Sequence, residues 1–181
     1  MSTKQRLIDT NILALQEGEK LLSVLKANQY TDGYKPAFQS TIGAHFRHVL
    51  EHYRCFFTQM ESACFCYDKR ERDATLECDS SHAEQTISYL IGLFGQLDHS
   101  QFEKAYTIDD EQSQGAVATT LERELLFLQS HTVHHYAIIG AMTRAFGNKP
   151  AADFGVAIAT RSHQKQNNND SNAGDISPCA Q

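Results

Sequence analysis

Six of the nine histidines lie in two short windows, His45–His52 and His131–His135. Together the windows span 13 positions of 181, where an even spread would place about one histidine. Imidazole is the commonest protein ligand for transition metals. A metal site inside a helical bundle takes its ligands from facing helices. The two windows therefore predict a metal centre between two helices.

His131 and His135 have the spacing i, i+4, which places them on adjacent turns of one helix face. Because two imidazoles in an apolar stripe need polar partners, a shared ion would satisfy both. One ligand from the first window would complete three, the number typical of a catalytic site with an open position. On a helical wheel His45 and His52 lie toward the middle of the buried arc and His48 near its edge. Wheel position alone does not choose among them.

Two other metal signatures are absent. Thr132 stands where the HExxH motif of zinc proteases needs glutamate. No histidine has a glutamate three residues before it, as the Glu-x-x-His motif of di-iron carboxylate bundles requires. A hemerythrin-like binding protein is an alternative, since His99-x-x-x-Glu103 precedes the HxxxH pair, but no HxxxxD follows. A bundle without metal, acting as a dimerisation or stress-response module, is a third possibility.

Several residues near the windows have two interpretations. Glu124 lies seven residues before His131 and could orient a water or act as a base. The alternative, which we favour, is a first-turn glutamate stabilised by the helix dipole. Glu51 falls on the polar side of its helix and His134 at a margin, so we expect both to be solvated. Cys55 could be a ligand, yet a small buried thiol is the more usual role.

The run Lys69–Arg72 mixes charges and predicts a solvated turn. If this segment folds over the end of the bundle, its arginines could instead bind an anionic thiol cosubstrate. The nearby Tyr67, like Tyr89 and Tyr136, is expected to be a core or rim aromatic.

Composition excludes several classes of protein. The chain has 22 acidic and 16 basic residues and a net charge of −6. Nucleic-acid binding usually needs a basic stripe, and an acidic chain has no attraction to anionic membranes. The start of the chain lacks the apolar stretch of a signal peptide, and no apolar run approaches the roughly 20 residues of a membrane span. We therefore expect a cytoplasmic protein with no nucleic-acid or membrane partner. The five cysteines show no CxxC spacing, which favours reduced thiols.

The elements that would position the histidines are four helices. Apolar periodicity, caps and breakers predict helices over 3–27, 38–60, 81–97 and 119–146. Long connections follow the second and third helices, over 63–80 and 98–118. The expected fold is all-α, a four-helix bundle formed by residues 1–160 with a short C-terminal packing segment. Residues 161–181 are polar and low in complexity, so we expect a disordered tail.

These motifs resemble the DinB/YfiT-like superfamily, whose members are bacterial four-helix bundles with a metal held by three histidines. The resemblance is carried by Ser40–His48 and His131–His135, with support from Tyr67–Asp73 and Asp153–Ala157. It covers roughly residues 5–160 and leaves the tail out.

The resemblance implies that His48 is the ligand on the second helix and that His131 and His135 are the pair on the fourth. It implies a divalent ion, zinc, nickel or iron. The superfamily includes thiol S-transferases, a maleylpyruvate isomerase and metal-dependent hydrolases. The expected function is thus a metal-dependent transferase or hydrolase acting on a small electrophilic substrate, in the first case with a low-molecular-weight thiol. A homodimer is compatible with this fold.

Overall fold

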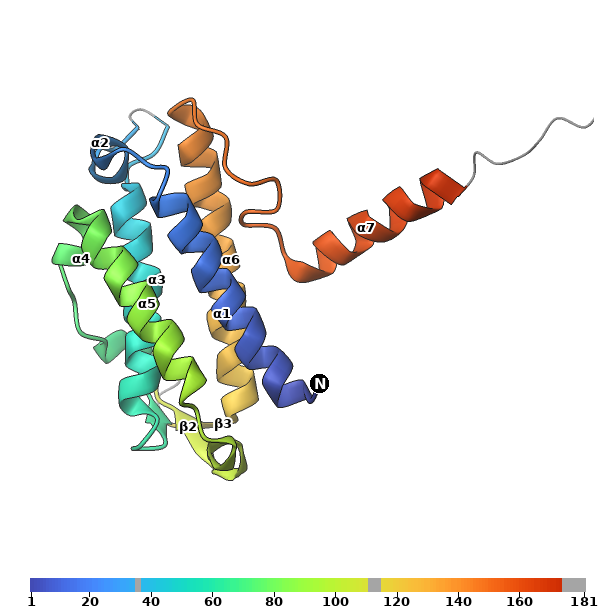
Figure 1. Ribbon diagram of the computed structural model, residues 1–181. Coiled ribbons are helices and arrows are strands. Elements are labelled where there is room, and N and C mark those ends of the chain that lie inside the picture. Colours follow the sequence, from blue (N-terminus) through green and yellow to red (C-terminus); the bar gives the residue numbers. More distant parts are fainter. Residues whose placement is uncertain (35–36, 111–114, 174–181) are drawn as a thin grey trace, which may run out of the picture.

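Four long helices form the body of the protein (Figure 1). The computed structural model describes residues 1–34, 37–110 and 115–173, with side chains up to residue 167. The bundle consists of α1 (Thr3–Leu22), α3 (Ile42–Gln59), α5 (Ser80–Gly95) and α6 (Leu121–Ala145). The predicted all-α class and the two long connections are confirmed. None of the helices within the described ranges is long and apolar enough to cross a membrane.

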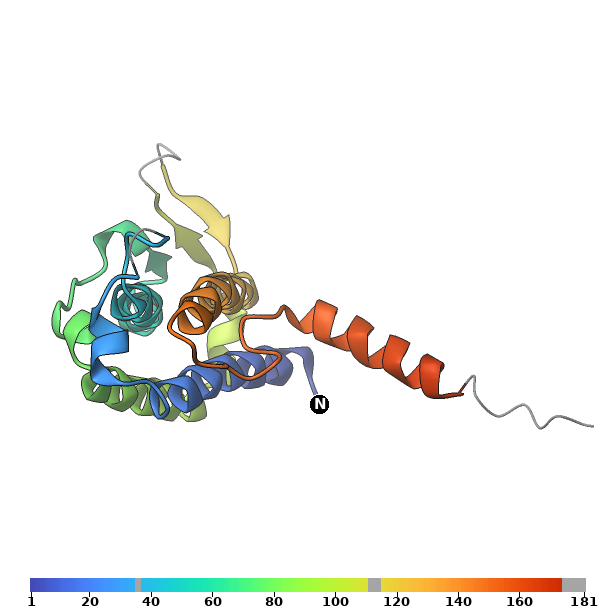
Figure 2. The same ribbon diagram turned by 90° about the horizontal axis from the view of Figure 1, so that it is seen from above.

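The order of the helices around the bundle brings the two histidine windows together. Both α1 and α3 pack against α5 and against α6. The consecutive helices α1 and α3 therefore occupy opposite corners. Seen from above, α3 and α6 lie side by side in one layer, with α1 and α5 in the other (Figure 2). The helices that carry the first and second windows are thus direct neighbours.

Each bundle helix begins at a side chain that accepts a hydrogen bond from a backbone N–H of its first turn. This satisfies donors that otherwise have no partner within the helix. The capping residues are Ser2, Thr41, Asp79 and Thr120. At the other end of α6, Gly147 has a positive φ of 83°, a left-handed conformation that glycine adopts readily.

The long connections contain short elements, of which the three strands join at one end of the bundle. The first holds β1 (Cys64–Phe65), η1 (Tyr67–Lys69) and α4 (Thr75–Cys78), and the second holds η2 (His99–Glu103), β2 (Tyr106–Ile108) and β3 (Val117–Thr119). A further short helix, α2 (Ala27–Thr31), follows α1. Strand β2 pairs in parallel with β1 and antiparallel with β3. The sequence did not predict this sheet, because strands of two or three residues carry no readable alternation.

The core lies between the four helices and contains a buried polar link. Asn11 of α1 donates its amide to the carbonyl of Leu125 on α6 at 3.0 Å, and Tyr53 of α3 donates to the Asn11 side-chain oxygen at 2.9 Å. These bonds tie three helices together. Elsewhere α4 approaches α3 at Gly43, where a Cβ would overlap the backbone carbonyl of Glu77.

The C-terminal region differs from the disordered tail that we predicted. Helix α7 (Ile158–Ala173) extends away from the bundle (Figures 1 and 2). It is anchored at its start, where Arg161 forms a two-point ion pair with Glu17 of α1 and donates to the carbonyl of Val156 at 2.7 Å. Before it, Phe154 is buried and stacks on Tyr136 of α6, so this segment packs on the bundle as expected. Residues 174–181 of the predicted tail lie outside the described residues.

Candidate metal centre

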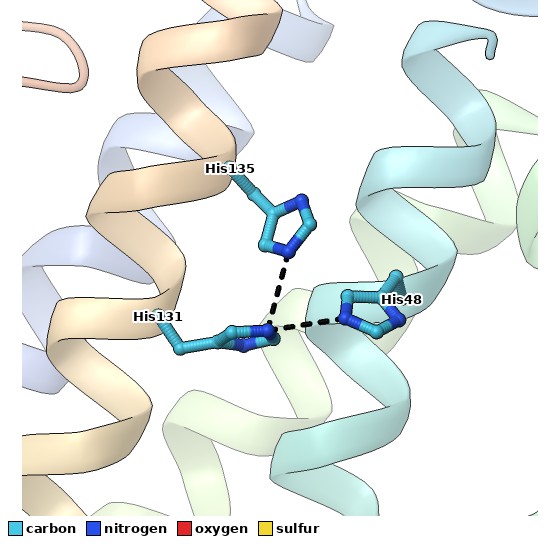
Figure 3. A group of neighbouring side chains, drawn as sticks. All are labelled: His48, His131 and His135. Carbon is cyan, nitrogen blue, oxygen red and sulfur yellow. Dashed lines mark hydrogen bonds between the residues drawn. The ribbon is translucent and has the colours of Figure 1, made fainter.

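Three histidines from two neighbouring helices converge on one point (Figure 3). His48 extends from α3, and His131 and His135 extend from successive turns of α6. The Nε2 atom of His131 lies 3.1 Å from Nε2 of His48 and 3.2 Å from Nε2 of His135. Among the described residues, these three form the group of potential ligands whose donor atoms all lie within 4.8 Å of one another. They are the three that the resemblance implies.

The spacing of these nitrogens fits one shared ion. Nitrogen ligands bound at 2.0–2.1 Å in a tetrahedral arrangement lie about 3.3 Å from one another. The two separations of 3.1 and 3.2 Å are close to that value. A set of three imidazoles suits zinc, nickel and iron. In addition, Nδ1 of His131 is buried without a hydrogen-bond partner among the described residues, so this ring makes its contacts through the nitrogen that faces the other two.

The environment keeps the three rings neutral. Burial lowers the pKa of His48 to about 2, with further lowering by the neighbouring His52 and the other triad members. Burial likewise lowers the pKa of His131 to about 3 and that of His135 to about 4, with His52 and His45 as the next causes, respectively. Because metal ligation requires the unprotonated ring, little competition from protons is expected at pH 7.

The other two histidines of the first window lie beside the triad. His45 Nδ1 is 2.9 Å from His135 Nδ1, the ring nitrogen opposite the one that faces the site. An acceptor in this place commonly orients a metal-binding histidine. His52 donates from Nδ1 to the backbone carbonyl of His48 at 2.7 Å and is buried. The helical wheel did not choose among the three histidines of this window. In the structure, His48 is the one that joins His131 and His135.

The connection after α3 folds over the polar side of that helix. Arg70 lies with its Nη2 3.2 Å from His48 Nδ1 and its Nε 3.3 Å from a carboxylate oxygen of Glu51, and it donates to the carbonyl of Tyr67 at 2.9 Å. Its side chain is only 8% exposed. The prediction of a solvated turn is therefore wrong for Arg70, although Arg72 and Lys69 are exposed.

Glu51 is buried, contrary to our expectation of a solvated glutamate. Besides Arg70, it accepts the backbone N–H of Asp73 at 2.9 Å, and Arg47 Nε lies 3.7 Å away. A helical wheel assigns Glu51 to the outer side of α3, but it cannot show that a later segment of chain covers that side. The Glu51–Arg70 contact could therefore not be predicted from the sequence.

Glu124, the candidate base, is also buried and serves to join elements. It accepts hydrogen bonds from Tyr67 at 2.9 Å, from Thr119 at 2.6 Å and from Arg123 at 3.0 Å. Tyr67 belongs to the first connection and Thr119 to the second, so the Glu124 carboxylate fastens both to α6. Glu124 lies in the first turn of α6, as the interpretation that we favoured placed it, and these contacts give it a structural role.

None of the remaining candidates joins the group of three ligands, although the His134 ring lies 5.2 Å from that of His135. Cys55 is a buried thiol as expected, with its pKa raised to about 11 by burial. His134 is exposed on α6. His99 lies in η2, and Glu103 forms a surface ion pair with Lys4. The HxxxE pair considered for a hemerythrin-like protein thus makes other contacts.

Comparison with known proteins adds one structural relative. No family model matches this chain, and no curated protein matches its sequence. A solved structure matches 82% of this chain and 91% of its own, with a TM-score of 0.59 and 15% sequence identity. It is YfiT from Bacillus subtilis, described as a probable metal-dependent hydrolase with an unusual four-helix bundle topology. The two chains share a fold. The resemblance inferred from the histidine motifs is confirmed at that level.

Proposed function

We propose that the protein is a metal-dependent hydrolase in which His48, His131 and His135 hold one divalent ion, zinc, nickel or iron. The observation that carries this proposal is the convergence of three neutral Nε2 atoms from α3 and α6. The description of YfiT as a probable metal-dependent hydrolase supports it. When bound, the ion would supply Lewis-acid chemistry, polarising a carbonyl or phosphoryl oxygen and making water more acidic.

Aromatic side chains give one side of the site a low-polarity wall. Phe127 stacks on His131 with a centroid separation of 5.4 Å and packs against Tyr67 at 5.0 Å. The ring of His52 lies 4.3 Å from that of His131. These rings exclude water from that side of the triad, which strengthens electrostatic interactions with a substrate. The wall would favour a small substrate with an apolar part.

Arg70 gives the site a cation next to the proposed ligand His48, and this favours a substrate with an anionic group. The same observation favours a second candidate function, transfer of a low-molecular-weight thiol to a small electrophilic substrate, since glutathione-like thiols carry carboxylates. The two functions differ in the nucleophile, which is water for hydrolysis and the thiol for transfer.

Activity measurements on the full chain separate these functions. The protein loaded with zinc or nickel is assayed against small carboxylic esters, amides, phosphoesters and an electrophile, each with and without added thiol. Hydrolysis that is independent of thiol and lost in His131→Ala supports the proposal. The exposed His134→Ala is the matched control on the same helix and should retain full activity. Product formation only with thiol would replace hydrolysis by transfer, and equal rates in wild type and His131→Ala would contradict both.

A further inference from the structure

The contact between Arg70 and His48 specifies which nitrogen of His48 carries the proton. A guanidinium has only donors. Since Arg70 Nη2 lies 3.2 Å from His48 Nδ1, this nitrogen must be the acceptor. A neutral imidazole that accepts at Nδ1 carries its one proton on Nε2. That proton points at Nε2 of His131, 3.1 Å away, which can accept it. Both contacts of His48 are then satisfied.

This arrangement and metal ligation by the same ring exclude each other. Nε2 is the atom of His48 that faces the other two ligands, and ligation needs its lone pair. A neutral ring that binds an ion through Nε2 must move its proton to Nδ1, where it would face an N–H of Arg70. Two donors then point at each other, and the guanidinium adds a positive charge beside the ion. Metal-binding histidines ordinarily present this N–H to an acceptor instead.

We propose that Arg70 competes with the metal ion for His48, so that binding of the ion displaces Arg70 from Nδ1 and the affinity of the site is set below what three histidines would otherwise give. Arg70 is held in this position by Glu51 and by the carbonyl of Tyr67, through Nε and Nη1. These two bonds do not involve the Nη2 end. The arginine can therefore remain attached to the first connection while its Nη2 end leaves His48. The inference rests on the metal site of the proposed function.

The test is the zinc affinity of the purified full chain, measured by competition with a chromophoric chelator at pH 7.5. We compare wild type with Arg70→Met, which removes the donor, and with Arg70→Gln, whose amide oxygen can accept from Nδ1. Substitution of a residue next to a metal ligand typically changes affinity by 10- to 100-fold. We expect both variants to bind zinc about tenfold more tightly than wild type. Circular dichroism verifies that each variant is folded.

Arg72→Gln is the matched control. Arg72 lies in the same connection, 4.0 Å from the same Glu51 oxygen, but its side chain is 58% exposed. Its replacement removes the same charge without removing a contact to His48, and screening by solvent limits the effect of that charge. We expect less than about a twofold change in zinc affinity. If zinc affinity rises only in the Arg70 variants, the change is due to the lost contact with His48.

Two results overturn the inference, and they are distinguishable. If zinc binding is lost in His131→Ala but is weaker or unchanged in the folded Arg70 variants, the site exists and Arg70 does not oppose the ion. Weaker binding would mean that Arg70 stabilises a doubly deprotonated His48 instead. If wild type and the Arg70 variants bind no more zinc than His131→Ala, the proposed function fails together with this inference.

Discussion

Replacing Glu51 by alanine tests how the connection that carries Arg70 is held to α3. Glu51 has no exposed side-chain surface, and it accepts the backbone N–H of Asp73 at 2.9 Å and Arg70 Nε at 3.3 Å. Glu51→Ala leaves that N–H without its acceptor and leaves the largely buried Arg70 cation without its carboxylate. Both losses destabilise the folded state.

The size of the effect follows from these contacts. Removing one partner of a buried ion pair costs about 3–5 kcal/mol. Because Arg70 keeps its hydrogen bond to the Tyr67 carbonyl, we expect a loss of stability at the lower end of this range, about 3 kcal/mol. With a urea m-value of about 2 kcal/mol per molar, the midpoint of unfolding should fall by about 1.5 M. Glu51→Gln keeps an acceptor oxygen and should recover part of this loss.

Urea unfolding followed by circular dichroism at about 222 nm measures this shift in a mainly helical protein; the chain has no tryptophan for fluorescence. Glu71→Ala is the control, because Glu71 also pairs with an arginine, Arg54, at 3.2 Å, but is 80% exposed. Exposed pairs contribute about 0–1 kcal/mol, so its midpoint should barely move. If Glu51→Ala unfolds at nearly the same urea concentration as Glu71→Ala, Glu51 does not anchor the connection to α3.

Three further predictions concern stability. Burial lowers the pKa of His131 from 6.5 to about 3, so the unfolded state binds more protons below pH 6.5. With chelator present, the free energy of unfolding should then fall as the pH drops from 7 to 5, and it should fall less steeply in His131→Ala. If urea titrations give both proteins the same slope of unfolding free energy against pH, His131 is not a buried neutral ring. Gly43→Ala places a methyl group against the carbonyl of Glu77 and should destabilise the folded state by about 1–3 kcal/mol, which lowers the melting temperature. An unchanged melting temperature would show that α4 moves away without cost. Tyr67→Phe removes a bond to the buried carboxylate of Glu124 and should cost about 2 kcal/mol; a urea midpoint equal to wild type would rule out that bond as an anchor.

The helices and two of the three candidate ligands were predictable from the sequence. Helix periodicity and the i, i+4 spacing identified His131 and His135 as a pair on one face of a long helix. The choice of His48 was different, because His45, His48 and His52 all lie within two turns of α3. Periodicity gives the angular position of a residue, but the distance to a facing helix depends on how the two helices pack. Only the resemblance favoured His48.

The surroundings of the triad could not be predicted, because they depend on contacts between segments far apart in the chain. Glu51 and Arg70 are 19 residues apart, and Tyr67 and Glu124 are 57 residues apart. Charged residues are rarely buried without a partner, and neither partner could be identified from local pattern. A buried Glu–Arg pair therefore has the same local signature as two solvated charges.

We propose that three histidines from α3 and α6 hold one divalent ion. The most direct test is the metal content of the purified chain after incubation with excess zinc and removal of free ion, for wild type, His48→Ala, His131→Ala and His134→Ala. We expect about one ion per chain in wild type and in His134→Ala, and loss of the ion in His48→Ala and His131→Ala. Near-zero metal in all four, or equal metal in all four, would contradict it.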